Sequence, residues 1–370
     1  MTNTIAAAFH GRDNNFNLIR FLAASAVLID HCFALVAPEQ AAASIIDLRS
    51  LETGRWAVDV FFVISGFLVT RSVMTQPTLI DYGVARVLRL FPALIVVCFV
   101  VAFILGPWVS LLPPLEYFAD PRPWLYVPFT ASLITHTMTL PGLFDTVPES
   151  GIVNSPLWTL RYEAFCYLLL ALLAAAGLFC SRARSGLTLA ALFALYGLVT
   201  FATDWREQSG ALDSIMRFLL DFFLGGALFV FADRIRLSLK VALALVAVAW
   251  LVHGTPLFEA SARIALAYGV IWLALVPAGA IRTFNRAGDY SYGLYIMCFP
   301  VQQTLVTLDP MLDPGALLAI SFPAVLALAM LSWHFIEHPV LEKKGRVGAP
   351  LSAAFAALRQ KRSQPLLSGA

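Results

Sequence analysis

The sequence predicts an all-α polytopic membrane protein, and its composition and its long apolar runs are the observations behind that prediction. Hydrophobic residues make up 59% of the 370 residues, and charged residues make up only 13%, against about 25% in soluble globular proteins. The mean hydropathy is +0.79. A soluble core of this chain length does not absorb so much apolar surface, whereas the hydrocarbon of a bilayer does.

Ten apolar runs are long enough to cross a bilayer, which takes about 17–25 residues. We predict that the first run is a retained transmembrane helix and not a cleaved secretory leader, because it contains Arg20, Asp30 and His31. An eleventh run, at 124–140, is interrupted by Pro128 and by polar residues. The ten runs lie near 16–37, 56–74, 90–110, 157–180, 186–203, 213–232, 237–253, 261–280, 290–308 and 315–337.

The positions of the basic residues predict the orientation. If ten helices cross and both termini are cytoplasmic, seventeen of the 25 Lys and Arg residues lie on the cytoplasmic side, five lie outside and three lie within helices. This bias follows the positive-inside rule. A crossing at 124–140 would invert every later loop and remove most of the bias. We therefore expect 111–156 to be one long outer-face segment between the third and fourth helices.

The chain divides into a transmembrane domain, 1–340, and a short basic cytoplasmic tail, 341–370, which we expect to lie along the anionic inner leaflet. A net charge of +2, with no basic run interleaved with aromatic residues, argues against nucleic acid as a partner. The five cysteines sit in apolar stretches without a CxxC pair. We interpret them as small buried hydrophobic residues, and we predict neither disulfides nor a metal site.

Ionisable groups at bilayer depth are costly, so each suggests a function. Arg20 and His31 in the first helix are eleven residues apart, which is about three turns and roughly 16 Å along one face. With the N-terminus inside, Arg20 lies near the cytoplasmic end and His31 lies beyond the midplane. The alternative is that Arg20 extends its charged end to the interface and His31 caps a buried polar group.

The second helix and the stretch after it contain two further patterns. Asp59 begins the second helix near the outer face, and Ser65-Gly66 forms a small-residue notch, which ordinarily lets helices approach closely. Arg86 and Arg89 follow in an amphipathic cytoplasmic stretch from Tyr82 to Pro92 and share one helical face. Such a pair suits phosphate binding, although attraction to anionic lipid is the plainer interpretation.

The fourth helix places Glu163 about two turns from the outer face, in the same half of the bilayer as His31. A carboxylate there is suited to orienting an imidazole and stabilising its charged form. An ion pair with Arg161 or Arg217 is the structural alternative.

Six segments taken together resemble the acyltransferase-3 family of membrane-bound bacterial O-acyltransferases, and the likeness extends from Asn15 to Val340. Arg20 and His31 match the Arg-x10-His signature of that family. The other matching segments are Asp59–Leu68, Arg86–Pro92 (RVLRLFP), Leu157–Tyr167, Tyr290–Tyr295 and Ile336–Pro339. The chain departs from the family where many members have His before the proline of the ninth helix, because Cys298-Phe299-Pro300 stands here. We also expect a stand-alone form, without the C-terminal esterase-like domain that some members have.

The resemblance implies a bacterial inner-membrane enzyme that moves an acyl group, most often acetyl, from cytoplasmic acyl-CoA to a hydroxyl of a carbohydrate acceptor such as a surface polysaccharide. We expect His31 to be the base, Glu163 to hold its ring, and Arg20 to assist catalysis or line the path of the pantetheine arm. The other expected site residues are Arg86, Arg89, Ser65 and Tyr292 for the cofactor, and Asp59, Trp158 and Arg161 for the acceptor.

A multi-helix transporter or lipid-linked sugar flippase is the competing interpretation, in which Arg20, His31, Asp59 and Glu163 form a proton or substrate pathway. It does not explain the Arg86/Arg89 face, and the sequence has no duplicated half with broken helices. The acceptor, the acyl chain length, the oligomeric state and the role of Cys298 stay open, as does the choice between direct transfer and an acyl-enzyme intermediate.

Overall fold

The computed structural model describes residues 4–36, 53–76, 78–134, 139–202 and 210–352. In this part of the chain the protein is helical, with two isolated β-bridges and no strand. The longer helices are α2 (Phe16–Val36), α3 (Thr53–Thr75), α4 (Leu79–Val100), α8 (Leu160–Ala175), α9 (Arg182–Ala202), α11 (Gly210–Val230), α12 (Leu239–Leu251), α13 (Phe258–Leu275), α15 (Ser291–Leu308) and α16 (Pro314–Ser332).

Seven of the described helices are long and apolar enough to cross a membrane, so the chain is a multi-pass membrane protein. All ten predicted runs form helices, but three of these fall outside the seven. Helix α11 carries Asp213, Arg217 and Asp221, α12 has only 13 residues, and α15 contains the buried amides Gln302 and Gln303. The number of crossings and the orientation therefore stay predictions, as does the tail, of which the part after residue 352 lies outside the described residues.

Helix α4 differs from the sequence prediction, which separated an amphipathic stretch ending at Pro92 from a span beginning at residue 90. The structure has one continuous helix that passes through Pro92 and a π-helical turn, η2 (Val101–Leu105), into α5 (Gly106–Val109). Pro92 lacks the N–H that would donate within the helix, and the Tyr292 hydroxyl donates to the nearby Leu90 carbonyl at 2.6 Å. The carbonyl that Pro92 leaves without its helical donor is that of Leu88, so this hydrogen bond joins α15 to α4 next to the gap.

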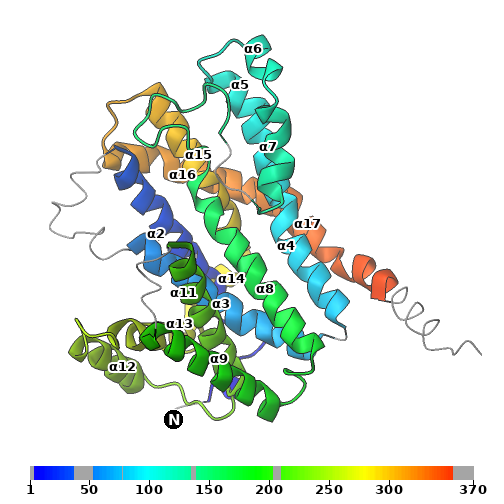
Figure 1. Cartoon of the computed structure of the whole chain (residues 1–370), viewed down its shortest axis with the longest axis vertical. Helices are drawn as coiled ribbons and strands as arrows, with labels where there is room; N and C mark the ends of the chain where they lie inside the picture. The colour runs from blue at the N-terminus through cyan, green and yellow to red at the C-terminus, as the bar shows by residue number, and fades with distance from the viewer. Residues whose placement is uncertain (1–3, 37–52, 77, 135–138, 203–209, 353–370) are drawn as a thin grey trace, which may run out of the picture.

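The predicted long segment between the third and fourth spans begins with α6 (Pro114–Ala119) and α7 (Arg122–Ala131). Helices α5 and α6 lie at one end of the molecule, at the top of Figure 1. Helix α7 has ten residues, about half of what a crossing requires. From Thr139 to Asn154 the chain forms no regular helix, and its apolar side chains Leu143, Phe144 and Val153 are buried. Asn154 donates to the Ile296 carbonyl at 2.9 Å. This carbonyl has no helical donor, because Pro300, four residues later, has no N–H.

Helix α3 is the central element, because it contacts α2, α4, α8, α11 and α13. Its closest neighbour is α11, and glycine makes that approach possible. A Cβ on Gly66 would collide with the Phe222 carbonyl, and a Cβ on Gly225 would collide with the Val63 carbonyl. The Ser65-Gly66 notch is therefore a helix-packing site, as the sequence suggested. Helices α9, α11, α12 and α13 gather on one side of α3, at the lower left of Figure 1.

Candidate active site

A cavity of about 710 Å³ enters the bundle from the end that the sequence predicts to be cytoplasmic. Arg71 and Val58, both on α3, line it, and the thirteen residues between them correspond to about 20 Å of helix. The cavity is therefore deep. It is bordered by the segment before α2, by α2, α3, α4, α8 and α15, by α14 (Phe284–Ala287), by the π-helical turn η5 (Trp333–Glu337) and by α17 (His338–Glu342).

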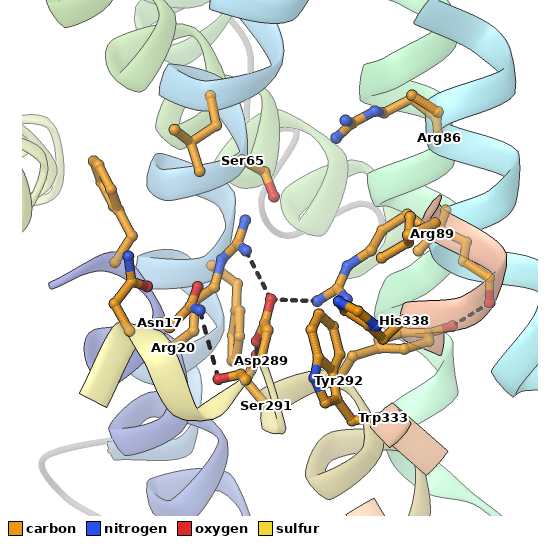
Figure 2. A pocket seen from close by; sticks show the side chains of 18 of the residues that line it. Asn17, Arg20, Ser65, Arg86, Arg89, Asp289, Ser291, Tyr292, Trp333 and His338 are labelled. Atoms are coloured by element: carbon orange, nitrogen blue, oxygen red, sulfur yellow. Dashed lines mark hydrogen bonds and ion pairs between the residues drawn. The ribbon is translucent and has the colours of Figure 1, made fainter. Parts of the chain in front are cut away.

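Asp289 joins two arginines at an intermediate level of this cavity. Its Oδ2 lies 3.2 Å from Arg20 Nη1 and 2.6 Å from Arg89 Nη2, and Ser291 donates to its other oxygen at 2.5 Å. Arg89 also reaches Glu337 at 3.2 Å. We call Arg20, Arg89, Asp289 and Glu337 the inner ring. Figure 2 shows Asp289 between the two guanidinium groups. Two arginines face two carboxylates, so the inner ring is close to neutral.

Arg86, one turn before Arg89 on α4, also lines the cavity, but it has no ion pair with any described residue. Its guanidinium lies 5.6 Å from the centre of the Tyr167 ring, and its buried Nε has no hydrogen-bond partner among the described residues. In Figure 2 its side chain reaches from α4 into the cavity in the direction of Ser65. Both predicted phosphate-binding arginines thus line one cavity, but only Arg86 has its charge uncompensated.

The deep part of the cavity is lined by polar side chains of α3, α8 and α15 and by the aromatic side chains of Phe61 and Phe62. Ser65 donates to Glu163 Oε1 at 3.1 Å, and the Tyr167 hydroxyl donates to the same oxygen. Tyr295 and Thr159 share a 2.7 Å hydrogen bond beyond them. Glu163 is therefore held by α3 and α8. Its contacts are with neither His31, which we expected it to orient, nor the arginines of the structural alternative.

His31 does not line the cavity. Its Nδ1 lies 2.7 Å from the Val27 carbonyl, and its ring packs edge-on against Phe299 with 5.3 Å between centroids. Phe299 is one helical turn beyond Tyr295, the last residue of α15 that lines the cavity. Phe299 thus lies about 6 Å of helix beyond the deep end, and His31 packs against it there. Arg20 and His31 share a helix but not the cavity.

The surroundings of His31 come from α15 and the segment before α8. Gln302 donates to the Leu28 carbonyl at 2.9 Å, and Gln303 donates to the carbonyls of Glu149 and Ile152 at 2.9 and 3.1 Å. Both glutamines are fully buried, and their side-chain oxygens have no partner among the described residues. The Glu149 carboxylate interacts electrostatically with the His31 ring, as does Asp30 on the same helix as His31. Sequence periodicity gave no signal for this arrangement.

Three other predicted site residues lie away from the cavity. Asp59 is buried in an ion-pair cluster with Arg217 at 2.8 Å and Arg263 at 3.2 Å, because α11 and α13 present arginines to it. Trp158 packs against Phe218, with ring centroids 5.7 Å apart. Arg161 lies over the neighbouring Tyr162 ring and donates to its hydroxyl at 2.9 Å. Their side chains have structural partners, and their role towards an acceptor stays a prediction.

Tyr292 lines the cavity, as expected of a cofactor-binding residue, and its ring lies 5.5 Å from the Arg89 guanidinium. Cys298 is buried, and its thiol donates to the Tyr295 carbonyl at 3.3 Å. Cys180 corrects the prediction of uniformly buried cysteines, because it is exposed at the turn after α8. All five cysteines are free.

Sequence reasoning missed Asp289 and Glu337 as members of the site. Glu337 stands in the matching segment Ile336–Pro339, and Asp289 directly precedes the segment Tyr290–Tyr295, but a single helix does not show which cation its carboxylate meets. It also missed the basic residues where the cavity opens, Arg12, Arg286 and Lys344. In the sequence, these basic residues at helix ends indicated only the orientation of the chain in the membrane.

The fold and the site together define a polytopic helical membrane protein with a deep cavity that is lined by arginines. Comparison with known proteins gives the family. The acyltransferase domain of the acyltransferase-3 family matches residues 13–334, so the chain belongs to this family. The prediction made from the six motifs is confirmed.

Two relatives are similar over most of their length. An O-acetyl transferase of Shigella phage Sf6 is 26% identical over 355 residues, which cover 90% of this chain and 97% of that protein. Nodulation protein 10 of Rhizobium leguminosarum bv. viciae is 27% identical over 376 residues, which cover 90% of this chain and 94% of that protein. No solved structure matches the chain. The protein is thus a membrane O-acyltransferase, and the family favours an enzyme over a transporter or flippase.

Proposed function

We propose that this enzyme transfers an acetyl group from acetyl-CoA, bound in the cavity from the cytoplasm, to a hydroxyl of a carbohydrate acceptor such as a surface polysaccharide. We place it in the bacterial inner membrane with both termini inside. The observation on which the proposal depends is the cavity itself, which is deep, open at the more basic end, and lined by an arginine without a carboxylate partner among the described residues, Arg86.

The order of groups along the cavity suits a long anionic thioester. Basic residues stand where it opens, followed by Arg86 and the inner ring, then Ser65 and Glu163, and finally Thr159 with Tyr295. Guanidinium groups bind phosphate by charge-assisted hydrogen bonds. A donor whose phosphates rest on the arginines would extend its neutral arm towards Ser65 and its thioester towards Tyr295. The Shigella phage relative is named an O-acetyl transferase, which supports acetyl as the transferred group.

The transfer step proceeds by attack of the acceptor hydroxyl oxygen on the thioester carbonyl carbon. The C–S bond breaks, the ester forms, and the hydroxyl proton ends on the sulfur of coenzyme A. We assign the base to His31, which receives the proton and passes it on. Since His31 lies one turn beyond the cavity, against Phe299, the acceptor would approach from the side of Gln303 and Glu149 and meet the thioester between Tyr295 and Phe299.

A matched pair of histidine variants tests the assignment. His31→Ala should abolish acetylation, measured as alkali-released acetate from the surface polysaccharide of cells that express each variant. His253→Ala is the control, because His253 is exposed between α12 and α13 and does not line the cavity. Both variants should reach the membrane in equal amounts. Undiminished acetylation with His31→Ala would remove this residue from the mechanism.

The identity of the donor and the existence of an acyl-enzyme intermediate are tested by separate experiments. Binding of acetyl-CoA to the purified protein in detergent distinguishes the enzyme from a flippase, which has no reason to bind it. Incubation with radiolabelled acetyl-CoA, without acceptor, separates the two chemical routes. Label retained on denatured protein indicates an acyl-enzyme intermediate, whereas label that stays entirely on coenzyme A indicates direct transfer.

A further inference from the structure

Besides Arg71 of α3, three basic residues stand where the cavity opens, and each of the three comes from a different segment. Arg12 precedes α2, Arg286 lies in α14, and Lys344 follows α17. We call these three the mouth. All three are exposed, and none forms an ion pair with a described residue. The one acidic residue that lines the cavity beside them, Glu342, is exposed and lies 3.9 Å from His338.

Hydrogen bonds and an ion pair fix two of these segments to each other. Asn285 donates to the Arg12 carbonyl at 2.5 Å, and Arg282 pairs with Asp13 at 2.6 Å. Arg282 also donates to the Leu275 carbonyl at 2.6 Å. The backbones of Arg12 and Arg286 therefore have a defined separation. Two cations from distant parts of the sequence are therefore held beside one opening.

The third segment is tied to the beginning of α4. The helical stretch after Lys344 reaches Ser352, whose hydroxyl lies 3.0 Å from that of Thr78, the residue that caps α4. Lys344 is thus carried by a helix that is anchored at its far end. Two of the mouth segments are thus fixed to each other, and the third is fixed to α4.

The mouth and Arg86 are separate positive sites. Arg86 lies seven residues inside α4, about 10 Å from the helix end, whereas the mouth residues belong to other segments at the opening of the cavity. The inner ring adds little net charge, because Asp289 and Glu337 offset Arg20 and Arg89. A ligand that satisfies both sites carries two anionic groups, one near its end and one further along.

We propose that the mouth binds the ribose 3′-phosphate of coenzyme A, while Arg86 faces the diphosphate. This assignment deepens the proposed function and rests on it. Coenzyme A carries a monophosphate on the ribose, separated from the diphosphate by the sugar. Dephospho-coenzyme A lacks only that monophosphate, and phosphopantetheine lacks the whole nucleotide end. The donor is then a complete coenzyme A thioester, and neither a pantetheine thioester nor an acyl carrier protein replaces it.

Binding of coenzyme A and of dephospho-coenzyme A to the purified full-length protein in detergent, measured by isothermal titration calorimetry, tests the proposal. A charge-assisted phosphate contact is worth about tenfold or more in affinity, so the wild type should bind coenzyme A at least about tenfold more tightly. Arg286→Ala and Lys344→Ala should each reduce this preference by weakening coenzyme A alone. Arg86→Ala should weaken both ligands by a similar factor.

Lys343→Ala is the matched control, because Lys343 is exposed beside Lys344 but does not line the cavity. It should leave both affinities unchanged. Equal affinities of the wild type for the two ligands would overturn the assignment while leaving the proposed donor intact. A preference that survives in the combined Arg286→Ala, Lys344→Ala variant would also overturn it. Failure of the wild type to bind either ligand, or acetyl-CoA, would instead overturn the proposed function.

Discussion

Replacement of Asp289 should show most clearly how much contacts between helices contribute to the stability of the protein. Asp289 connects α2 and α4 through Arg20 at 3.2 Å and Arg89 at 2.6 Å, and its side chain is buried. The Asp289→Asn change keeps the size of the side chain and one oxygen acceptor but removes the negative charge. Two partly buried guanidinium groups then lose the carboxylate between them.

The expected cost follows from the partners that remain. Removal of one member of a buried ion pair costs about 3–5 kcal/mol. Arg89 retains Glu337 at 3.2 Å, whereas Arg20 has no other ion pair among the described residues. We therefore expect Asp289→Asn to lower the free energy of unfolding by about 3 kcal/mol. A double-mutant cycle with Arg20→Gln should show a coupling energy of about 1–3 kcal/mol.

Denaturant unfolding of the purified protein in mild detergent, followed by tryptophan fluorescence, measures both quantities. Asp13→Asn is the matched control, since Asp13 pairs with Arg282 at 2.6 Å but has a side chain that is 64% exposed. An exposed pair contributes about 1 kcal/mol or less. Equal losses for the two variants, or additive effects of Asp289→Asn and Arg20→Gln, would refute the view that burial makes Asp289 the structural centre of the inner ring.

Two further predictions concern helix packing. Gly66→Ala should abolish accumulation of folded protein, because the added methyl group would collide with the Phe222 carbonyl. Size-exclusion chromatography after extraction measures this, with Gly83→Ala as a control that meets open space, and a normal yield of Gly66→Ala would contradict the packing. Asn154→Ala should lower the free energy of unfolding by about 1–3 kcal/mol, because the Ile296 carbonyl loses its donor. The same denaturant titration measures it, and an unchanged midpoint would exclude a structural role for this hydrogen bond.

The helices themselves followed from the sequence, because each depends on local properties. Apolar runs of sufficient length form helices in every predicted place, and the Ser65-Gly66 pair identified a packing notch before its partner was known. Spacing placed Arg86 and Arg89 on one face, and both line the cavity. The six ordered motifs also identified the family. Periodicity and composition are sufficient for these conclusions because they describe one helix at a time.

Tertiary structure alone decided which polar groups meet. Asp289 is 269 residues from Arg20 and 200 residues from Arg89 along the chain, and no spacing rule relates them. His31 lies on the predicted helix, yet Phe299 of α15 packs against it beyond the end of the cavity, so a shared helix face did not give a shared cavity. A helical period fixes the direction of a side chain from its own axis. Which helix this side chain faces depends on the crossing angles and close approaches between distant segments, and those depend on the packing of the whole bundle.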